Sequence, residues 1–176
     1  MNIFYLDHDP CAAAQYMCDK HIGKMLVESA QLLYTAHHVY DSAFIQQKAA
    51  DEGLTAYKQT HTNHPCAIWV RESGGNYDWL WWHANALAAE FKLRFGKTHA
   101  TQKHLWVLSF DPLGIKKTSR TTDPLGIKKT SRTTAVQCMP EKYKDECPVT
   151  AYRKYYAEGK KHLHKWTNKN TPFFCE

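Results

Sequence analysis

Polar side chains suited to acid–base chemistry recur along the first long helical segment of the chain. His21, Lys24 and Glu28 follow one another at three- and four-residue spacing, so a helix places them on one face, and Gln31 and Thr35 continue that face. A Glu at the boundary between a polar and an apolar face is partly desolvated, which suits a general acid or base. The alternative is a solvated helix face that carries an ordinary Lys–Glu pair.

A second polar group stands immediately before the next helical segment. His61, Asn63 and His64 precede a proline, and Arg71 follows within two turns. Asn is a frequent N-cap and Pro is well tolerated in the first turn, so we expect a helix over residues 66–73 capped by Asn63. Two histidines at a helix entrance can bind a metal, a phosphate or a base edge, whereas the simpler interpretation is a capping segment.

A third group lies near the C-terminus. Tyr152, Arg153 and Tyr155 alternate aromatic rings with cations inside a predicted helix over residues 149–165. This arrangement suits stacking on bases beside phosphate contacts. The alternative is a solvated amphipathic helix whose tyrosines lie in the core.

The cysteines form no metal-binding pattern that the sequence makes recognisable. No Cys-x-x-Cys pair occurs, and Cys11, Cys18 and His21 do not match the spacing of zinc ligands. The first residues lack the basic and apolar regions of a secretory signal, which favours free thiols in a reducing compartment. We therefore expect no metal, no other cofactor and a cytoplasmic location.

Composition places the chain among globular proteins. With 43% hydrophobic and 13% aromatic residues it is not a disordered chain, and no apolar run is long enough to cross a bilayer. Its length of 176 residues suits one domain, residues 1–176. The net charge of +6 is compatible with a nucleic-acid partner. Phosphate-binding Gly-rich loops, Gly-x-Ser-x-Gly and His-Glu-x-x-His are absent from the sequence, which excludes P-loop NTPases, α/β-hydrolases and zincins.

The remaining periodicity predicts a mostly α fold. We expect a short lead-in over residues 1–10, a helix from about 11 to 40, a short helix and a loop within 41–60, a buried helix over 77–95, and a short helix or strand within 105–110. Asn76 is expected to cap the buried helix and Gly96 to end it.

A tandem duplication interrupts the second half of the chain. Residues 111–122 and 123–134 both read DPLGIKKTSRTT, and twelve residues are too few for a solenoid repeat. We interpret residues 111–148 as a long basic loop in which 111–134 is a duplicated surface segment.

The order of these groups resembles that of the phage pyrimidine-dimer DNA glycosylases, which are small all-helical enzymes of the endonuclease V type. The resemblance rests on the following stretches: Asp19-Lys20-His21 through Glu28, Glu90 through Arg94-Phe95-Gly96, and Tyr152 through Tyr156. Asn63-His64-Pro65 followed by Trp69 is similar to a bacterial branch of the same superfamily.

This resemblance implies a single endonuclease V-like helical domain with a glycosylase pocket at the N-terminus. In that family the free α-amine attacks C1′ of the sugar to form a Schiff base, with assistance from a Glu of the first long helix. Carried over by position, the amine belongs to Met1, the acid/base residue is Glu28 and His21 is an active-site or DNA contact. An α-amine is a competent nucleophile near neutral pH.

Three positions depart from the family pattern. Asn2 replaces a small Thr, and Ile3 and Val27 stand where the family carries arginines that hold DNA. The resemblance thus predicts the same pocket without fixing the lyase reaction or the target. A different base, a modified nucleotide or a free nucleotide fits equally well.

The leading hypothesis is an enzyme that acts on a nucleobase or its N-glycosidic bond, such as a DNA N-glycosylase. Its expected substrate is DNA or a nucleotide. Its expected location is the host cytoplasm if the gene is viral. The residues expected to bind substrate are Lys24, His61, Asn63, His64, Arg71, Tyr152, Arg153 and Tyr155. The alternative is a non-catalytic phage protein on the same fold that binds nucleic acid or a partner. A third hypothesis is metal-dependent hydrolysis through His61 and His64.

Overall fold

The computed structural model describes residues 1–115, 120–122, 128–130 and 132–176, with the backbone alone described within 116–131. The chain is mostly helical, as the sequence predicts. Its main helices are α1 (Pro10–Tyr16), α2 (Asp19–Asp51), α3 (Pro65–Glu72), α4 (Gly74–Phe95), α5 (His104–Val107) and α6 (Pro148–Lys154). In the described part of the chain, no helix is long and apolar enough to cross a membrane.

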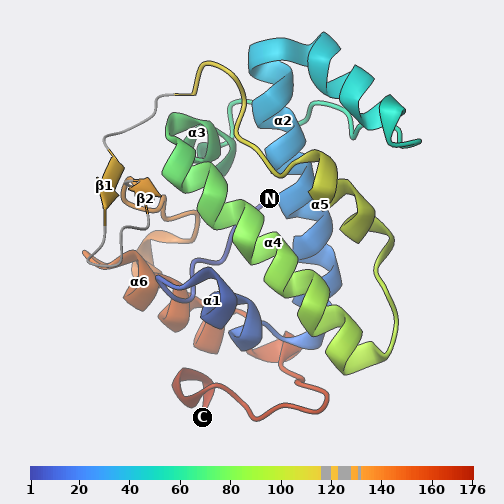
Figure 1. Ribbon diagram of the computed structural model, residues 1–176. Coiled ribbons are helices and arrows are strands. Elements are labelled where there is room, and N and C mark those ends of the chain that lie inside the picture. The colour runs from blue at the N-terminus through green and yellow to red at the C-terminus, as the bar shows by residue number, and fades with distance from the viewer. Residues whose placement is uncertain (116–119, 123–127, 131) are drawn as a thin grey trace.

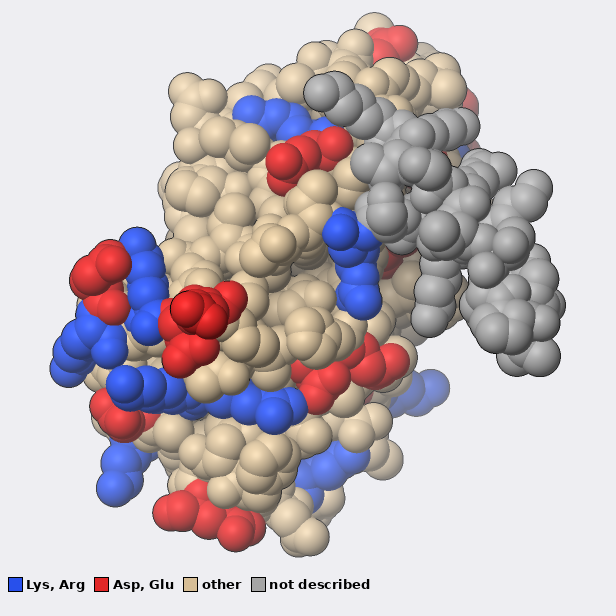
Figure 2. All heavy atoms as spheres, turned by 90° about the vertical axis from the view of Figure 1, so that its left-hand side faces the viewer, with Lys and Arg blue, Asp and Glu red and all other residues tan. Residues whose placement is uncertain are grey.

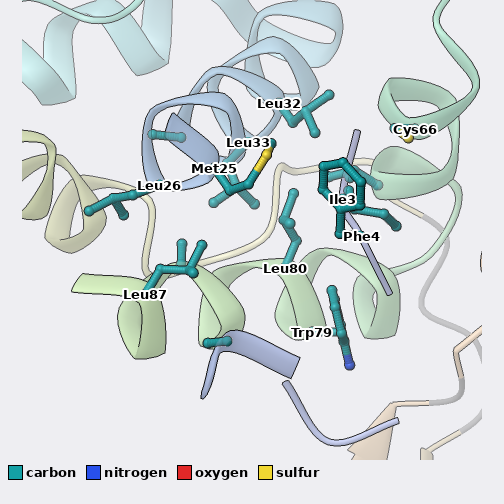
Figure 3. Packing of buried hydrophobic residues seen from close by; sticks show 14 of the residues in the cluster. Ile3, Phe4, Met25, Leu26, Leu32, Leu33, Cys66, Trp79, Leu80 and Leu87 are labelled. Atoms are coloured by element: carbon teal, nitrogen blue, oxygen red, sulfur yellow. The ribbon is translucent and has the colours of Figure 1, made fainter. Parts of the chain in front are cut away.

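The long helices α2 and α4 cross at the centre of the molecule, and α1 packs on α4 (Figure 1). Side chains from both helices fill the space between them, among them Met25, Leu33 and Leu80 (Figure 3). Residues 3–6 of the lead-in are buried in the same core, where Ile3 and Phe4 lie beside α3 and α4. The N-terminus is therefore held inside the helical bundle.

The first helical stretch is divided where the sequence predicts one helix. Met17 and Cys18 adopt extended conformations and separate α1 from α2. A second break occurs within α2 at Asp41, whose φ and ψ of −153° and 92° are not helical. The Asp41 carboxylate accepts a hydrogen bond from the backbone N–H of Phe44 at 2.9 Å, so it acts as an N-cap for the remaining turns. The expected short helix within 41–60 is this last part of α2.

Two predicted caps are wrong by one and three residues. His64, not Asn63, caps α3 through its ring nitrogen, and Ser73, not Asn76, caps α4. Asn76 instead lies buried in the first turn of α4, where its amide donates to the backbone oxygen of Trp69. Gly96 ends α4 with a φ of 66°, as predicted, because glycine adopts the left-handed conformation at no steric cost.

The predicted helix over 149–165 is too long. The α6 helix ends at Lys154 and continues as a π-helical turn, Tyr155–Gly159, and a 3₁₀ turn, Lys161–Leu163. The aromatic tail packs on the body, with the Phe174 ring 5.3 Å from the Tyr16 ring.

Other short elements complete the chain. A 3₁₀ turn, Ala100–Lys103, leads into α5, so the segment near 105–110 is helical rather than extended. Two further 3₁₀ turns cover Glu141–Tyr143 and Phe173–Cys175.

The duplicated segment contains a short hairpin rather than loop alone. Strand β1 (Arg120–Thr122) from the first copy pairs antiparallel with β2 (Lys128–Thr130) from the second, with Arg120 opposite Thr130. After the hairpin, the Arg132 guanidinium donates to the backbone oxygen of His8 at 2.7 Å. The chain thus returns from the hairpin to the N-terminal segment.

A buried ion-pair network fixes α4 against the start of α2. The Arg94 side chain is fully buried and lies 3.0 Å from Glu90 and 3.3 Å from Asp19. It also donates to the backbone oxygens of Met17 and Gln15 at 2.7 and 2.9 Å. The guanidinium therefore satisfies the carbonyls at the break between α1 and α2.

We expect Arg94→Met to lower the free energy of unfolding by about 3–5 kcal/mol, because it removes the buried cation that pairs with Glu90 and Asp19 and leaves the backbone oxygens at the α1–α2 break without this donor. Lys144→Met, which breaks an exposed pair with Glu141, is the matched control and should cost less than about 1 kcal/mol. Urea unfolding measures both. Equal losses in the two variants would show that the buried network does not hold this junction.

Candidate active site

The N-terminal residues are anchored at a junction of three chain segments. The backbone N–H of Asn2 donates to the Glu28 carboxylate of α2 at 3.1 Å. The Asn2 amide donates to the backbone oxygen of Cys138 at 2.7 Å, and its oxygen accepts from the N–H of Phe4 at 3.0 Å. Phe4 is bulky yet has a φ of 43°, a costly conformation that these contacts maintain. The N-terminal amine belongs to Met1, so it lies one residue before the backbone N–H that donates to Glu28.

Glu28 is held from two sides. One carboxylate oxygen accepts from Asn2, and the other lies 3.7 Å from the ammonium of Lys24. The Glu28 side chain retains 17% of its exposure, whereas that of Lys24 retains 65%. The carboxylate is thus partly desolvated, while the cation that neutralises it remains in solvent.

His21 lies in the core rather than on a solvated polar face. Its ring is buried, stacks on the Phe4 ring at a centroid distance of 4.6 Å, and contacts the Tyr156 hydroxyl through Nδ1 at 2.8 Å. Burial, followed by the charges of Lys160 and Lys24, lowers the pKa of His21 to about 4. At neutral pH this histidine is a neutral support for Phe4, and Thr35 of the same predicted face is also buried.

A cavity of about 510 Å³ opens beside the N-terminus. Met1, His64 and Tyr155 line it together with Pro65 and residues 136–140. The cavity therefore brings together Met1, His64 of the second polar group and Tyr155 of the third, although they are distant along the chain. No residue of the first polar group lines it: His21, Lys24 and Glu28 are absent from its wall. A second cavity of about 530 Å³, along the C-terminal part of α2, contains none of the predicted site residues.

His64 connects the cavity with a pair of cysteines. Its Nδ1 accepts from the backbone N–H of Cys66, and the Cys66 thiol donates to the sulfur of Cys138 at 3.5 Å. Burial, then the N-terminal amine and His61, lower the pKa of His64, whereas Glu28 acts in the opposite direction. The hydrogen bond between the thiols raises the pKa of Cys66 and lowers that of Cys138. His64 is thus electrostatically coupled to both the amine and Glu28.

Tyr152 supports the wall of the cavity from behind. It is fully buried, its hydroxyl donates to the backbone oxygen of Val136 at 2.8 Å, and it accepts from the N–H of Cys138 at 3.2 Å. Burial raises the pKa of Tyr152. The predicted substrate-binding Tyr152 therefore positions the segment that lines the cavity.

The two predicted arginines make contacts within the protein. Arg153 pairs with Asp7 at 2.7 Å and donates to the backbone oxygen of Leu6, while Arg71 donates to the backbone oxygen of Thr62. Neither arginine lines the cavity. These contacts hold the lead-in and the segment before α3 in place.

His61 and Asn63 are exposed on that same segment. His61 has a φ of 49°, and its Nδ1 lies 2.6 Å from the Thr60 hydroxyl. The structure does not bring these two residues into the lining of the cavity.

The charged surface is mixed where the structure describes it. Figure 2 shows Lys and Arg side chains interspersed with Asp and Glu on the described part of the face that carries α6. Apart from Arg132, the basic side chains of the duplicated segment, including Lys128 and Lys129, lie outside the described residues. Near the cavity, the Lys160 ammonium lies 5.0 Å from the centre of the Tyr155 ring.

A comparison with known protein families matches the first part of the chain. Residues 1–104 match the family model described as pyrimidine dimer DNA glycosylase, which is more than half of the chain. The chain belongs to the pyrimidine dimer DNA glycosylase family. The matched part includes Met1, Glu28 and His64, whereas Cys138 and Tyr155 lie beyond it. Neither the curated proteins nor the solved structures contain a match.

Sequence reasoning missed three residues of this site. Asn2 departs from the family pattern, yet it fixes the N-terminal turn through three hydrogen bonds. Cys66 stands two residues after His64, a short-range spacing that could have signalled a joint role. Cys138 lies 72 residues from Cys66, so only the tertiary structure brings it to the site.

Proposed function

We propose that this protein cleaves the N-glycosidic bond of a base in DNA, with Glu28 as the acid/base residue and the Met1 amine as the nucleophile. The observation that carries the proposal is the hydrogen bond from the backbone N–H of Asn2 to Glu28, one residue after Met1, which lines the cavity. Membership of a DNA glycosylase family supports the same reaction class.

The chemistry requires a nucleophile, a proton acceptor and a way to release the base. The amine nitrogen forms a bond to C1′ of the sugar, and the base leaves with the electron pair of the broken C1′–N bond. Glu28 accepts a proton from the attacking amine and returns it to the departing base. The C1′–O4′ bond of the sugar then breaks, O4′ takes up a proton from Glu28 or solvent, and the amine nitrogen and C1′ form the Schiff base.

The target nucleotide has to leave the duplex to reach this cavity. Tyr155 offers a ring at the cavity wall on which a base can stack, and Lys160 beside it offers a cation for a phosphate. The exposed ammonium of Lys24 offers another. Because Ile3 and Val27 replace the arginines of the family pattern, these lysines are the proposed phosphate contacts in their place.

Borohydride trapping tests the proposal, since reduction makes a Schiff base between protein and DNA permanent. The substrates are duplexes with a pyrimidine dimer, an abasic site or hypermodified thymines, and the readout is a covalent adduct followed by base-release analysis. We expect an adduct with the native N-terminus and none with a variant extended by Gly-Ser before Met1. Mass spectrometry of the adducted peptide locates the attachment.

The outcomes separate the parts of the proposal. An adduct that the extension leaves unchanged would overturn the amine as nucleophile. Base release without an adduct would retain the glycosylase reaction and replace the amine by water. No product from any of these substrates, with salt-sensitive DNA binding retained, would favour the non-catalytic alternative.

A further inference from the structure

Three side chains of metal-ligand type meet between the start of α3 and the segment that lines the cavity. One ring nitrogen of His64 and the sulfurs of Cys66 and Cys138 all lie within 4.8 Å of one another. The two sulfurs are 3.5 Å apart. Among the described residues, the structure contains one group of three or more His, Cys, Asp or Glu side chains close enough to share a metal ion, and it is this one.

The spacing of the sulfurs is close to that of a tetrahedral metal site. Zinc–sulfur bonds of about 2.3 Å at tetrahedral angles place two sulfurs roughly 3.8 Å apart. The observed separation of Cys66 and Cys138 therefore differs from that of a bound pair by a few tenths of an ångström. Such a change needs only small side-chain rotations.

The backbone around the ligands is already fixed. His64 and Cys66 flank the first residue of α3, so the helix start sets their separation. Figure 3 shows Ile3 of the lead-in beside Cys66. On the other side, the Asn2 amide and the Tyr152 hydroxyl hold the backbone of Cys138. The ligands are thus preorganised rather than carried on free loops.

We propose that His64, Cys66 and Cys138 bind a divalent cation of the zinc class, with one coordination position open to the cavity. Two thiolates and one imidazole select Zn²⁺ over the oxygen-preferring Mg²⁺ and Ca²⁺. Binding releases the thiol protons to solvent. His64 and Cys138 both line the cavity, so the fourth position faces the space beside Met1, as in zinc sites that keep a place for water or substrate.

This site goes beyond the glycosylase proposal and does not depend on it. The metal would join α3 to residues 136–140, which form two walls of the cavity. The hydrogen bond between the Cys66 and Cys138 thiols would be lost, and each sulfur would instead bind the same metal ion. The sequence did not predict it because Cys138 is so far from Cys66 along the chain.

Cobalt titration tests the site without reference to enzyme activity. The full chain, purified without a His tag and reduced with a phosphine, is titrated anaerobically with Co²⁺. We expect tetrahedral visible bands and a thiolate-to-cobalt charge-transfer band at one equivalent, displaced by Zn²⁺. We also expect Zn²⁺ to raise the melting temperature, because an ion that binds only the folded state stabilises it.

Variants assign the ligands. Cys66→Ser and Cys138→Ser should each abolish the charge-transfer band or weaken Co²⁺ binding by at least about tenfold. His64→Asn should do the same while preserving the helix cap, because Asn is also a good N-cap. Cys147 lies outside the group, so Cys147→Ser is the control variant and should bind Co²⁺ like the unmodified chain. The other three cysteines outside the group are present in every variant and show whether thiols elsewhere bind the ion.

Two results would overturn the site. One is a reduced, folded chain that gives no thiolate–cobalt band. The other is a band that survives in Cys138→Ser and His64→Asn, since the metal would then sit on other thiols. Circular dichroism of each variant shows that a lost band does not reflect unfolding.

Discussion

Glu28→Gln should lower the rate of base release by about 10²- to 10⁴-fold, the range that a positioned general acid or base contributes. The glutamine oxygen can still accept the hydrogen bond from Asn2, so the N-terminal turn keeps its position. What the amide loses is the ability to take up and return a proton. Single-turnover rates on whichever duplex gives an adduct measure the effect.

The pair with Lys24 is lost in this variant as well, but its contribution to stability is small. The two charges are 3.7 Å apart, and Lys24 is largely exposed, so solvent screens the interaction. We therefore expect DNA affinity and the urea midpoint of Glu28→Gln to stay close to those of the unmodified chain. A large loss of either would mean that the carboxylate has a structural role.

Glu52→Gln is the matched control for the same chemical change. Glu52 is exposed at the C-terminal end of α2, away from the cavity, and its substitution should leave the rate unchanged. Equal rates for Glu28→Gln and the unmodified chain would remove Glu28 from the mechanism. A borohydride adduct that persists in Glu28→Gln at a reduced rate would separate proton transfer from nucleophilic attack.

Sequence periodicity predicted the helices because local rules determine them. The three- and four-residue spacing of apolar positions predicted α2 and α4, and the glycine at position 96 marked the end of α4. The spacing of Lys24 and Glu28 likewise predicted their pairing. Each of these features depends on residues within one or two turns of one another.

The composition of the site could not be predicted in the same way. Cys138 reaches Cys66 only through the return of residues 132–140 after the hairpin, and no local pattern encodes that path. The burial of His21 is another case, because the polar spacing suggested solvent exposure while Phe4 and Tyr156 enclose the ring. Asn2 shows the same limit, since its partners lie 26 and 136 residues away.

The free energy of unfolding should fall steeply as the pH drops from about 6.5 toward 5. His21, His37 and His83 are buried, and burial lowers the pKa of each to about 4. Between pH 4 and the ordinary histidine value of 6.5, the unfolded chain therefore binds more protons than the folded one. Stability from this source is complete above 6.5 and is lost on acidification, by about 1.4 kcal/mol per pH unit for each histidine.

The surroundings of these rings leave them little capacity to accept a proton. His83 Nδ1 contacts the backbone oxygen of Pro10 at 2.9 Å, and its Nε2 is buried without a hydrogen-bond partner. His37 contacts the Tyr77 hydroxyl at 2.8 Å. Three such groups together give about 4 kcal/mol per pH unit, which is enough to unfold a domain of ordinary stability.

Urea unfolding at intervals from pH 8 to 5 measures this slope, and two variants identify its source. His83→Gln should reduce the slope below pH 6.5 by about 1.4 kcal/mol per pH unit, since the proton that this histidine takes up on unfolding is no longer bound. His8→Gln removes an exposed histidine and should leave the slope unchanged. A stability that stays flat from pH 8 to 5, or equal slopes in His83→Gln and the unmodified chain, would contradict the assignment, because acid would then act on groups other than the buried imidazoles.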